Sequence, residues 1–193
     1  MSAILLFCTS KVPGSVINRL MQESALPDGA FNIFSLVRTP DQALDEWNTE
    51  PPVQDFDTGF DGKSDTELRK FLQERLDEHT DTQTTSISDS WLAVLDNKSP
   101  SQNTVVLHYA YEKSSWGSGS IPGPAEFSDD NKTIWWKWRV PFKSAWTFWN
   151  AVGSIGADAI EIYSRAEYRN SEGILQTETP QKIIDGEIED PKA

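Results

Sequence analysis

The chain has 193 residues, enough for one domain with a sizeable core. Its apolar and aromatic content is that of a folded globular protein, and its net charge of −13 disfavours binding to nucleic-acid phosphate or to anionic lipid. A single cysteine, Cys8, excludes a disulfide framework and a thiolate metal cluster. The chain starts with a short apolar run that no basic region precedes, and no segment approaches a membrane span in length. We therefore expect a cytoplasmic protein.

The charge is unevenly distributed along the chain. Fourteen acidic and four basic residues between positions 41 and 90 give a net charge of −10, whereas six basic and three acidic residues between positions 131 and 169 give +3. An acidic stretch of this kind is typical of a solvated face that keeps a protein in solution. The alternative is a docking surface for a basic protein partner.

The N-terminal residues predict a strand, a helix and a second strand. Ala3–Phe7 is apolar throughout, as in a strand that is covered on both faces. A helix that begins at Pro13 carries an apolar stripe at helical spacing, and Phe31–Val37 is again an apolar run. This order indicates a βαβ unit with two parallel strands.

Two capping patterns predict helices in the acidic stretch. Thr39 and Gln42 predict a short helix that extends through Trp47. Ser64 and Glu67 repeat the pattern at the start of a longer amphipathic helix. Farther on, two apolar segments, 91–96 and 104–112, predict strands of an antiparallel hairpin, and the Gly-, Ser- and Pro-rich residues 114–130 predict a long loop.

Residues 133–156 hold five of the eight tryptophans and predict a core strand that leads directly into a core helix. Alternation places Trp136 and Trp138 on one face of the strand and Trp135 on the other. A proline then ends the strand, and Gly153 is the expected cap of the helix that follows.

The remaining segments complete the predicted fold. Ile160–Tyr168 predicts a further strand, Ile174–Thr177 predicts a short edge strand, and the acidic residues 179–193 predict a tail that frays. We therefore predict an α/β (α+β) fold with one domain over residues 1–178. It would contain a mixed sheet of five to seven strands, the N-terminal βαβ unit and three to four packing helices.

Two binding patterns fail on their spacing. Residues 61–64 (DGKS) lack the leading glycine of a phosphate-binding loop, because Asp57 occupies that position. The acidic segment 55–66 lacks the central glycine and the terminal glutamate of a calcium loop. Because the chain also has only two histidines, we predict no metal site and no cofactor.

One face of the core strand carries the candidate ligand-binding residues. Trp135, Lys137 and Arg139 would form either an aromatic and cationic wall for a small organic or anionic ligand, or a cation–π packing motif. Trp116, on the long loop, is a candidate cover for that wall. Arg38 follows the second parallel strand, where the crevice beyond the strand ends usually binds ligands in open α/β sheets.

His108 is the candidate general acid or base. It alternates along its strand, and it could transfer protons if it faced a cavity beside a carboxylate. The alternative is a strand histidine that is either buried with satisfied hydrogen bonds or half-exposed.

The second half of the chain resembles an uncharacterised domain family of bacteria and fungi. The matching segments are Phe60-Asp61-Gly62, Trp91–Asp96, Arg139-Val140-Pro141, Trp146, and the stretch from Asn150 through Asp158 and Glu161 to Tyr163. The chain departs from the family pattern within Gly153–Asp158, which lacks the second asparagine and is shifted by one residue. The resemblance implies no activity, but it directs attention to Arg139 and adds Asp158 and Glu161 as catalytic candidates.

Three functional hypotheses follow. The first is a non-catalytic domain that binds a small ligand or a protein. The second is a cofactor-independent enzyme, such as an isomerase, a cyclase or a hydrolase, that acts on a small organic substrate in an aromatic pocket. The third is an acidic inhibitor of a basic partner.

Overall fold

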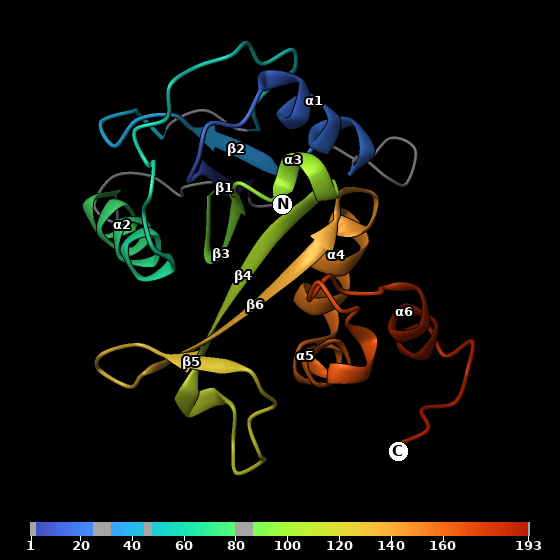
Figure 1. Ribbon diagram of the computed structural model, residues 1–193. Helices are drawn as coiled ribbons and strands as arrows, with labels where there is room; N and C mark the ends of the chain where they lie inside the picture. Colours follow the sequence, from blue (N-terminus) through green and yellow to red (C-terminus); the bar gives the residue numbers. More distant parts are fainter. Residues whose placement is uncertain (1–2, 25–31, 45–47, 80–86, 193) are drawn as a thin grey trace.

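The computed structural model describes residues 3–24, 32–44, 48–79 and 87–192. One sheet contains six strands: β1 (Ala3–Cys8), β2 (Phe34–Val37), β3 (Ile87–Leu95), β4 (Thr104–Glu112), β5 (Ala125–Phe127) and β6 (Thr133–Pro141). Six α-helices accompany them: α1 (Gly14–Glu23), α2 (Asp65–His79), α3 (Ser99–Gln102), α4 (Ala145–Ile155), α5 (Ala157–Ser164) and α6 (Glu178–Ile184). Figure 1 shows their arrangement.

The sheet is mixed, with the strand order β2-β1-β3-β4-β6-β5. β1 runs parallel to β2 and to β3, whereas β3–β4, β4–β6 and β5–β6 are antiparallel pairs. The predicted α/β class, the single domain, the N-terminal βαβ unit and the β3–β4 hairpin are therefore confirmed. The structure has more helices than the three or four that we expected.

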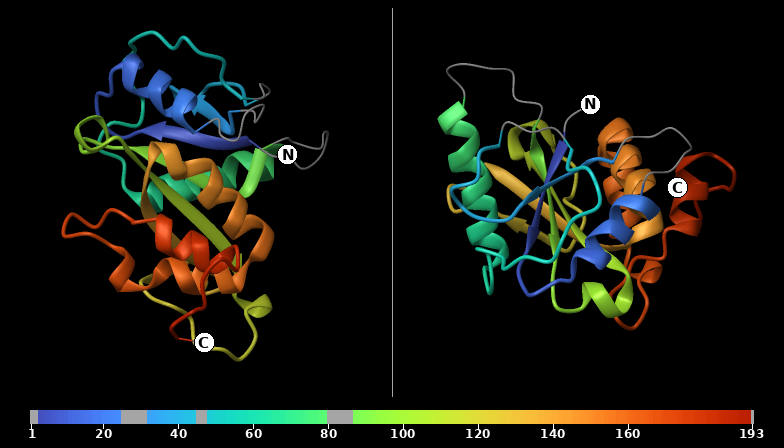
Figure 2. Two further views of the ribbon diagram at one scale, coloured as in Figure 1. Left: turned by 90° about the vertical axis from the view of Figure 1, so that its right-hand side faces the viewer. Right: turned by 90° about the horizontal axis from the view of Figure 1, so that it is seen from above.

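Helices cover both faces of the sheet (Figure 2). On one face, called the α2 face, Leu68 and Leu72 of α2 pack against sheet residues that include Leu5 and Phe7. On the opposite face, called the α4 face, the core is larger and draws on α1, α4, α5 and α6. None of the helices in the described ranges combines the length and the apolar character that crossing a membrane requires.

The alternation predicted for the core strand is present in β6. Trp136 and Trp138 are buried on the α4 face, and Trp135 is buried on the α2 face. The strand leads into α4 through one 3₁₀ turn, Phe142–Ser144. Gly153 is not the cap that we predicted, because α4 continues to Ile155 and Gly156, at φ 74°, follows its last residue.

The prediction of a strand at residues 160–168 is wrong. Residues 157–164 form α5, and a 3₁₀ turn, η3 (Ala166–Tyr168), follows it. Ala159, Ile160 and Tyr163 are all buried, and their spacing places them on one side of a helix. The alternating Ile160 and Ile162 suggested a strand, because a run this short fits both periods.

The short helix predicted from Thr39 is absent from the described residues 39–44 and otherwise falls outside the described part of the chain. Gln42 instead closes a turn and caps the end of β2. Its side-chain Oε1 accepts the Arg38 N–H at 2.8 Å, and its Nε2 donates to the Leu36 carbonyl at 2.9 Å. The second capping pattern is confirmed, because the carboxylate of Glu67 accepts the Ser64 N–H at 2.9 Å at the start of α2.

Two C-terminal segments pack onto the domain. Ile174 pairs with Arg139 of β6 through an isolated parallel bridge, in the segment predicted as an edge strand. Residues 178–184, within and beside the segment that we expected to fray, form α6, in which Ile183 is buried. The Tyr163 hydroxyl donates to Gln181 of α6 at 2.5 Å and thereby connects α6 to α5.

Residues 53–62, called the covering segment, lie over the carboxyl ends of β1 and β2. Asp55 accepts the Gly14 N–H at the start of α1 at 2.7 Å, and Thr58 donates to the Cys8 carbonyl at 2.7 Å. Gly62 donates its N–H to the Thr9 carbonyl at 3.0 Å. The protein's own chain therefore occupies the edge of the sheet where a ligand crevice was expected.

Candidate functional site

Three of the predicted site residues, His108, Trp135 and Lys137, lie together on the α2 face. α2 adds Arg69 to this group, and its guanidinium carbon lies 4.9 Å from the Trp135 ring centroid. Cation–π packing, one of the two alternatives considered for this face, is therefore present, with Arg69 as the cation.

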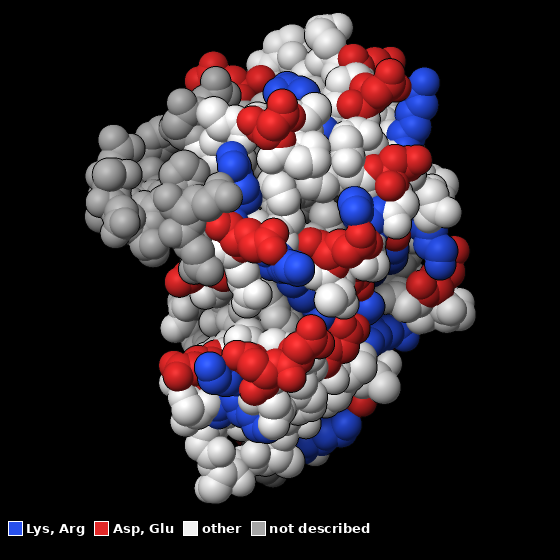
Figure 3. Space-filling model, turned by 90° about the vertical axis from the view of Figure 1, so that its left-hand side faces the viewer, with Lys and Arg blue, Asp and Glu red and all other residues white. Residues whose placement is uncertain are grey.

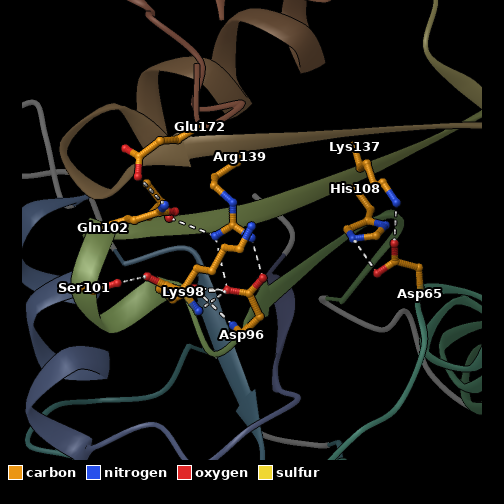
Figure 4. Close-up of polar contacts among 11 residues, drawn as sticks. Asp65, Asp96, Lys98, Ser101, Gln102, His108, Lys137, Arg139 and Glu172 are labelled. Atoms are coloured by element: carbon orange, nitrogen blue, oxygen red, sulfur yellow. Dashed lines mark hydrogen bonds and ion pairs between the residues drawn. The ribbon is translucent and has the colours of Figure 1, made fainter. Parts of the chain in front are cut away.

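The polar side chains of this group form a closed ring, called the α2-face ring. Glu126 of β5 accepts from Arg69 Nη1 at 2.6 Å and from Lys137 Nζ at 3.1 Å. Asp65, at the start of α2, accepts from Lys137 Nζ at 2.8 Å and lies 3.5 Å from His108 Nε2 (Figure 4). Arg69 Nη2 lies 3.2 Å from His108 Nδ1 and closes the ring. Two cations and two carboxylates balance its charge.

His108 is fully buried within this ring. Because Arg69 has only donors, His108 Nδ1 must accept, and the ring proton of the neutral imidazole is then on Nε2, toward Asp65. Burial, and secondarily the Arg69 and Lys137 charges, lower the pKa of His108 well below its usual value. Burial alone would raise the pKa of Asp65, but its contacts with His108 and Lys137 keep that pKa low. His108 thus fits the alternative of a core histidine, although its buried Nε2 forms no hydrogen bond with a described residue and lies 3.5 Å from Asp65.

A cleft of about 310 Å³ lies between α2 and the β5–β6 hairpin, and Arg69 and Trp135 contribute to its wall. His108 is not part of that wall. The cations that this group presents already bind carboxylates of the protein, so a charged ligand would have to displace one of these ion pairs.

Arg139 points to the same face of β6 but has a different role. Its Nη1 donates to Asp96 at 3.2 Å and to Thr104 at 3.0 Å, and its Nη2 forms a second bond to Asp96. Asp96 also accepts the backbone N–H groups of Lys98 and Ser99 (Figure 4). Arg139 therefore connects the end of β3, the start of β4 and β6, and its donors are engaged within the protein.

Arg38 and Trp116 lie away from the ring. Arg38 follows β2 and stacks on Phe56 of the covering segment, with 5.6 Å between the guanidinium carbon and the ring centroid. Trp116 packs on Trp136, with ring centroids 5.2 Å apart. Because Trp136 faces the α4 side, Trp116 lies on the opposite side of the sheet from Trp135 and does not cover the predicted wall.

The carboxylates Asp158 and Glu161 lie on α5, beside two hollows. One hollow, of about 420 Å³, lies between α5 and α6 and includes both carboxylates. The other, of about 410 Å³, is called the Arg169 cavity. It is bounded by Pro122–Pro124 of the long loop, the C-terminal end of α5, η3, Arg169 and Lys192. Glu161 belongs to the wall of both hollows, whereas Asp158 belongs only to the first.

The Arg169 cavity contains an uncompensated cation. Arg169 is half-buried, and its side chain forms no hydrogen bond or ion pair with any other described residue. Burial lowers the pKa of Arg169, although an arginine in a protein stays charged at neutral pH. Ser164, only 4% exposed, is also part of the wall, and its hydroxyl lacks a partner within the described part of the chain.

The other two cations of this cavity are neutralised. Arg165 forms a bidentate pair with Asp190, at 2.6 and 2.7 Å, and Lys192 pairs with Glu167. Arg169 thus differs from its neighbours in that no carboxylate of the described residues pairs with it. An unpaired half-buried charge is costly, so this position is the most suitable one in the described structure for an anionic ligand.

Arg69 and Arg169 were not among the residues predicted from the sequence. Arg69 and its partner Glu126 are 57 positions apart in the sequence, and no local pattern reveals such a pair. Arg169 had one signal, because it closes the basic stretch between positions 131 and 169. That signal does not separate the unpaired arginine from the paired ones.

Among the described residues, no group of three or more His, Cys, Asp or Glu side chains is arranged to hold a metal ion. Comparison with protein-family models, with curated proteins and with solved structures found no match to this chain.

Proposed function

We propose that this protein is a non-catalytic binding domain that holds a small anionic ligand in the Arg169 cavity. One observation carries the proposal: a half-buried guanidinium, without a partner among the described residues, lies in the wall of a hollow of about 410 Å³. That volume falls in the range of small-molecule sites, and hydrogen bonds from a guanidinium to a bound anion would offset the cost of its burial.

The enzyme hypothesis has less support. His108, the candidate acid or base, is buried in the α2-face ring and is not part of the Arg169 cavity. Glu161 is part of the cavity wall, but its side chain is 65% exposed, whereas a catalytic acid or base usually lies in a site that excludes water.

The inhibitor hypothesis also has less support. On the face that carries α2, groups of Asp and Glu alternate with Lys and Arg (Figure 3). Lys63–Glu67 and Lys70–Glu74 are two of the pairs in this pattern. A continuous acidic face, as required to occupy a basic site, is therefore not the arrangement that this view presents.

The test is binding of small anions, measured by tryptophan fluorescence and thermal shift, with acetate, benzoate and inorganic phosphate as probes. At least one probe should bind saturably and raise the melting temperature. Arg169→Gln should weaken that binding at least tenfold, because a charge-assisted hydrogen bond contributes about 1.5–3 kcal/mol.

Arg19→Gln is the matched control, because Arg19 is on α1 and bonds only to the side chain of Asn103 among the described residues. It removes the same charge and should leave the binding unchanged. Equal affinity in wild type and in Arg169→Gln, with both folded, would refute the proposal.

A further inference from the structure

The charge of the Arg169 cavity limits the charge of its ligand. The wall contains three cations, Arg165, Arg169 and Lys192, and two carboxylates, Glu161 and Glu167, which leaves one positive charge. Asp190 additionally neutralises Arg165. With Asp190 included, three carboxylates match the three cations, but none of them pairs with Arg169. One anionic charge would therefore be compensated at Arg169, and a second would meet the carboxylates of the rim.

The position of the cavity in the fold also disfavours a ligand with two negative charges. The cavity lies beside Ser164, the last residue of α5, so the carbonyl end of that helix is nearest to the ligand. The negative end of the helix dipole opposes any anion at this position, and it opposes a dianion such as phosphate more strongly than a monoanion. A planar guanidinium, in contrast, matches the two oxygens of a carboxylate.

The part of the wall that the long loop contributes fits an apolar body. Pro122, Gly123 and Pro124 have no polar side-chain atoms, and Ala166 adds a methyl group on η3. This wall is held in place, because Trp136 of β6 donates its indole N–H to the Pro122 carbonyl at 2.8 Å. The Trp116 ring packs on Trp136 behind it.

We infer that the ligand of the Arg169 cavity is a monocarboxylate with a compact apolar body, such as an aromatic ring or a short branched alkyl group. Its carboxylate pairs with Arg169, and its body lies against Pro122–Pro124. This inference rests on the proposed function, and it adds the charge and the shape of the ligand. It also implies that binding changes the emission of Trp136, which contacts the wall directly.

Four probes separate these features. Benzoate has the charge and the body, acetate lacks the body, benzamide lacks the charge, and phenyl phosphate carries the same ring with up to two charges. We expect benzoate to bind at least tenfold more tightly than each of the other three at pH 8, where phenyl phosphate is a dianion. Arg169→Gln should abolish this preference.

Glu161→Gln provides an internal check, because it removes one rim charge from an exposed side chain and should not affect folding. It should improve phenyl phosphate binding several-fold relative to benzoate. If phenyl phosphate or acetate equals benzoate in the wild type, and that binding still depends on Arg169, the ligand class is wrong while the site stands. If no anion binds in an Arg169-dependent manner, both the class and the proposed function fail.

Discussion

The roles of Arg139 and Arg169 differ because only one of them has a carboxylate partner among the described residues. Arg139 and Arg169 are both tied through their backbones to the same short segment, since Arg139 bridges to Ile174 and Arg169 bridges to Leu175. Asp96 pairs with both terminal nitrogens of Arg139, whereas no described residue pairs with the guanidinium of Arg169. The first arginine is therefore part of the scaffold, and the second is the one that we propose binds a ligand.

Arg139→Ala should lower the free energy of unfolding by about 2–3 kcal/mol, because it leaves the partly buried carboxylate of Asp96 without its cation. The value lies below that of a fully buried pair because the Arg139 and Asp96 side chains retain 14% and 26% exposure. Urea unfolding followed by tryptophan fluorescence measures the change.

The matched control is Lys98→Ala. Lys98 reaches Asp96 only through its backbone N–H, so removal of its side chain should change stability by less than about 0.5 kcal/mol. A similar loss in both variants would show that the Arg139–Asp96 pair is not what stabilises this corner.

Part of this residue-level detail could be predicted from the sequence. Alternation along β4 and β6 placed His108 on one side and grouped Trp135 with Lys137 correctly. It could not supply Asp65, Arg69 and Glu126, because α2 and β5 approach these strands only through tertiary packing. For the same reason the sequence could not distinguish a wall open to ligands from a ring that neutralises its own charges.

At the level of elements, the covering segment and α1 are fitted to each other. A Cβ on Gly14 would lie 2.5 Å from the Val53 carbonyl oxygen. The side-chain amide of Asn18 on α1 hydrogen-bonds to both backbone polar groups of Val53. It accepts the Val53 N–H at 2.7 Å and donates to the Val53 carbonyl at 3.0 Å. The start of α1 therefore requires glycine because the covering segment lies directly on it.

Gly14→Ala should destabilise the protein by about 1–3 kcal/mol, because the new methyl group must displace backbone atoms of the covering segment.

Gly153→Ala should have the opposite effect on stability. Gly153 lies inside α4, and a Cβ there meets no atom within 4 Å. Its replacement should stabilise by about 0.5–1 kcal/mol.

Thermal and urea unfolding of the two single variants give both values. If Gly14→Ala were as stable as the wild type, the covering segment would not be seated on α1 as described.

Most elements could be predicted from periodicity and capping, and the errors have specific causes. The Ser64–Glu67 pattern predicted the start of α2 because both partners are local. Thr39 and Gln42 presented the same pattern, but Gln42 hydrogen-bonds to the end of β2 instead. Ile160, Ile162 and Tyr163 are spaced in a way that suits a strand or a helix, and packing against α4 and α6 selects the helix.

At the level of the whole molecule, the α2-face ring makes stability depend on pH. The pKa of His108 is lowered in the folded protein, so below the ordinary histidine pKa the unfolded chain binds a proton that the folded chain does not. Stability therefore falls as the pH falls through that ordinary value. Asp65, Asp96 and Glu126 also have lowered pKa values in the folded protein. The stability that these carboxylates contribute is lost at a lower pH than the histidine effect, when they become protonated.

The free energy of unfolding should consequently decrease by up to about 1.4 kcal/mol per pH unit between pH 6 and 5, before carboxylates titrate. Urea midpoints across this range measure the slope. His108→Gln should flatten it whatever its own stability, because glutamine does not titrate. A slope that persists unchanged in His108→Gln would mean that another group is responsible.

The strand order also has a consequence for how the chain acquires its fold. β1 lies between β2 and β3, yet β3 begins about 50 residues after β2 ends, whereas β3, β4, β6 and β5 are joined by antiparallel pairings between near neighbours in sequence. Loop closure favours the local pairings, so the antiparallel half should assemble first and the parallel β1–β3 seam should close last. During synthesis β1 emerges long before its central neighbour, and its wholly apolar strand must be kept from aggregation until β3 arrives.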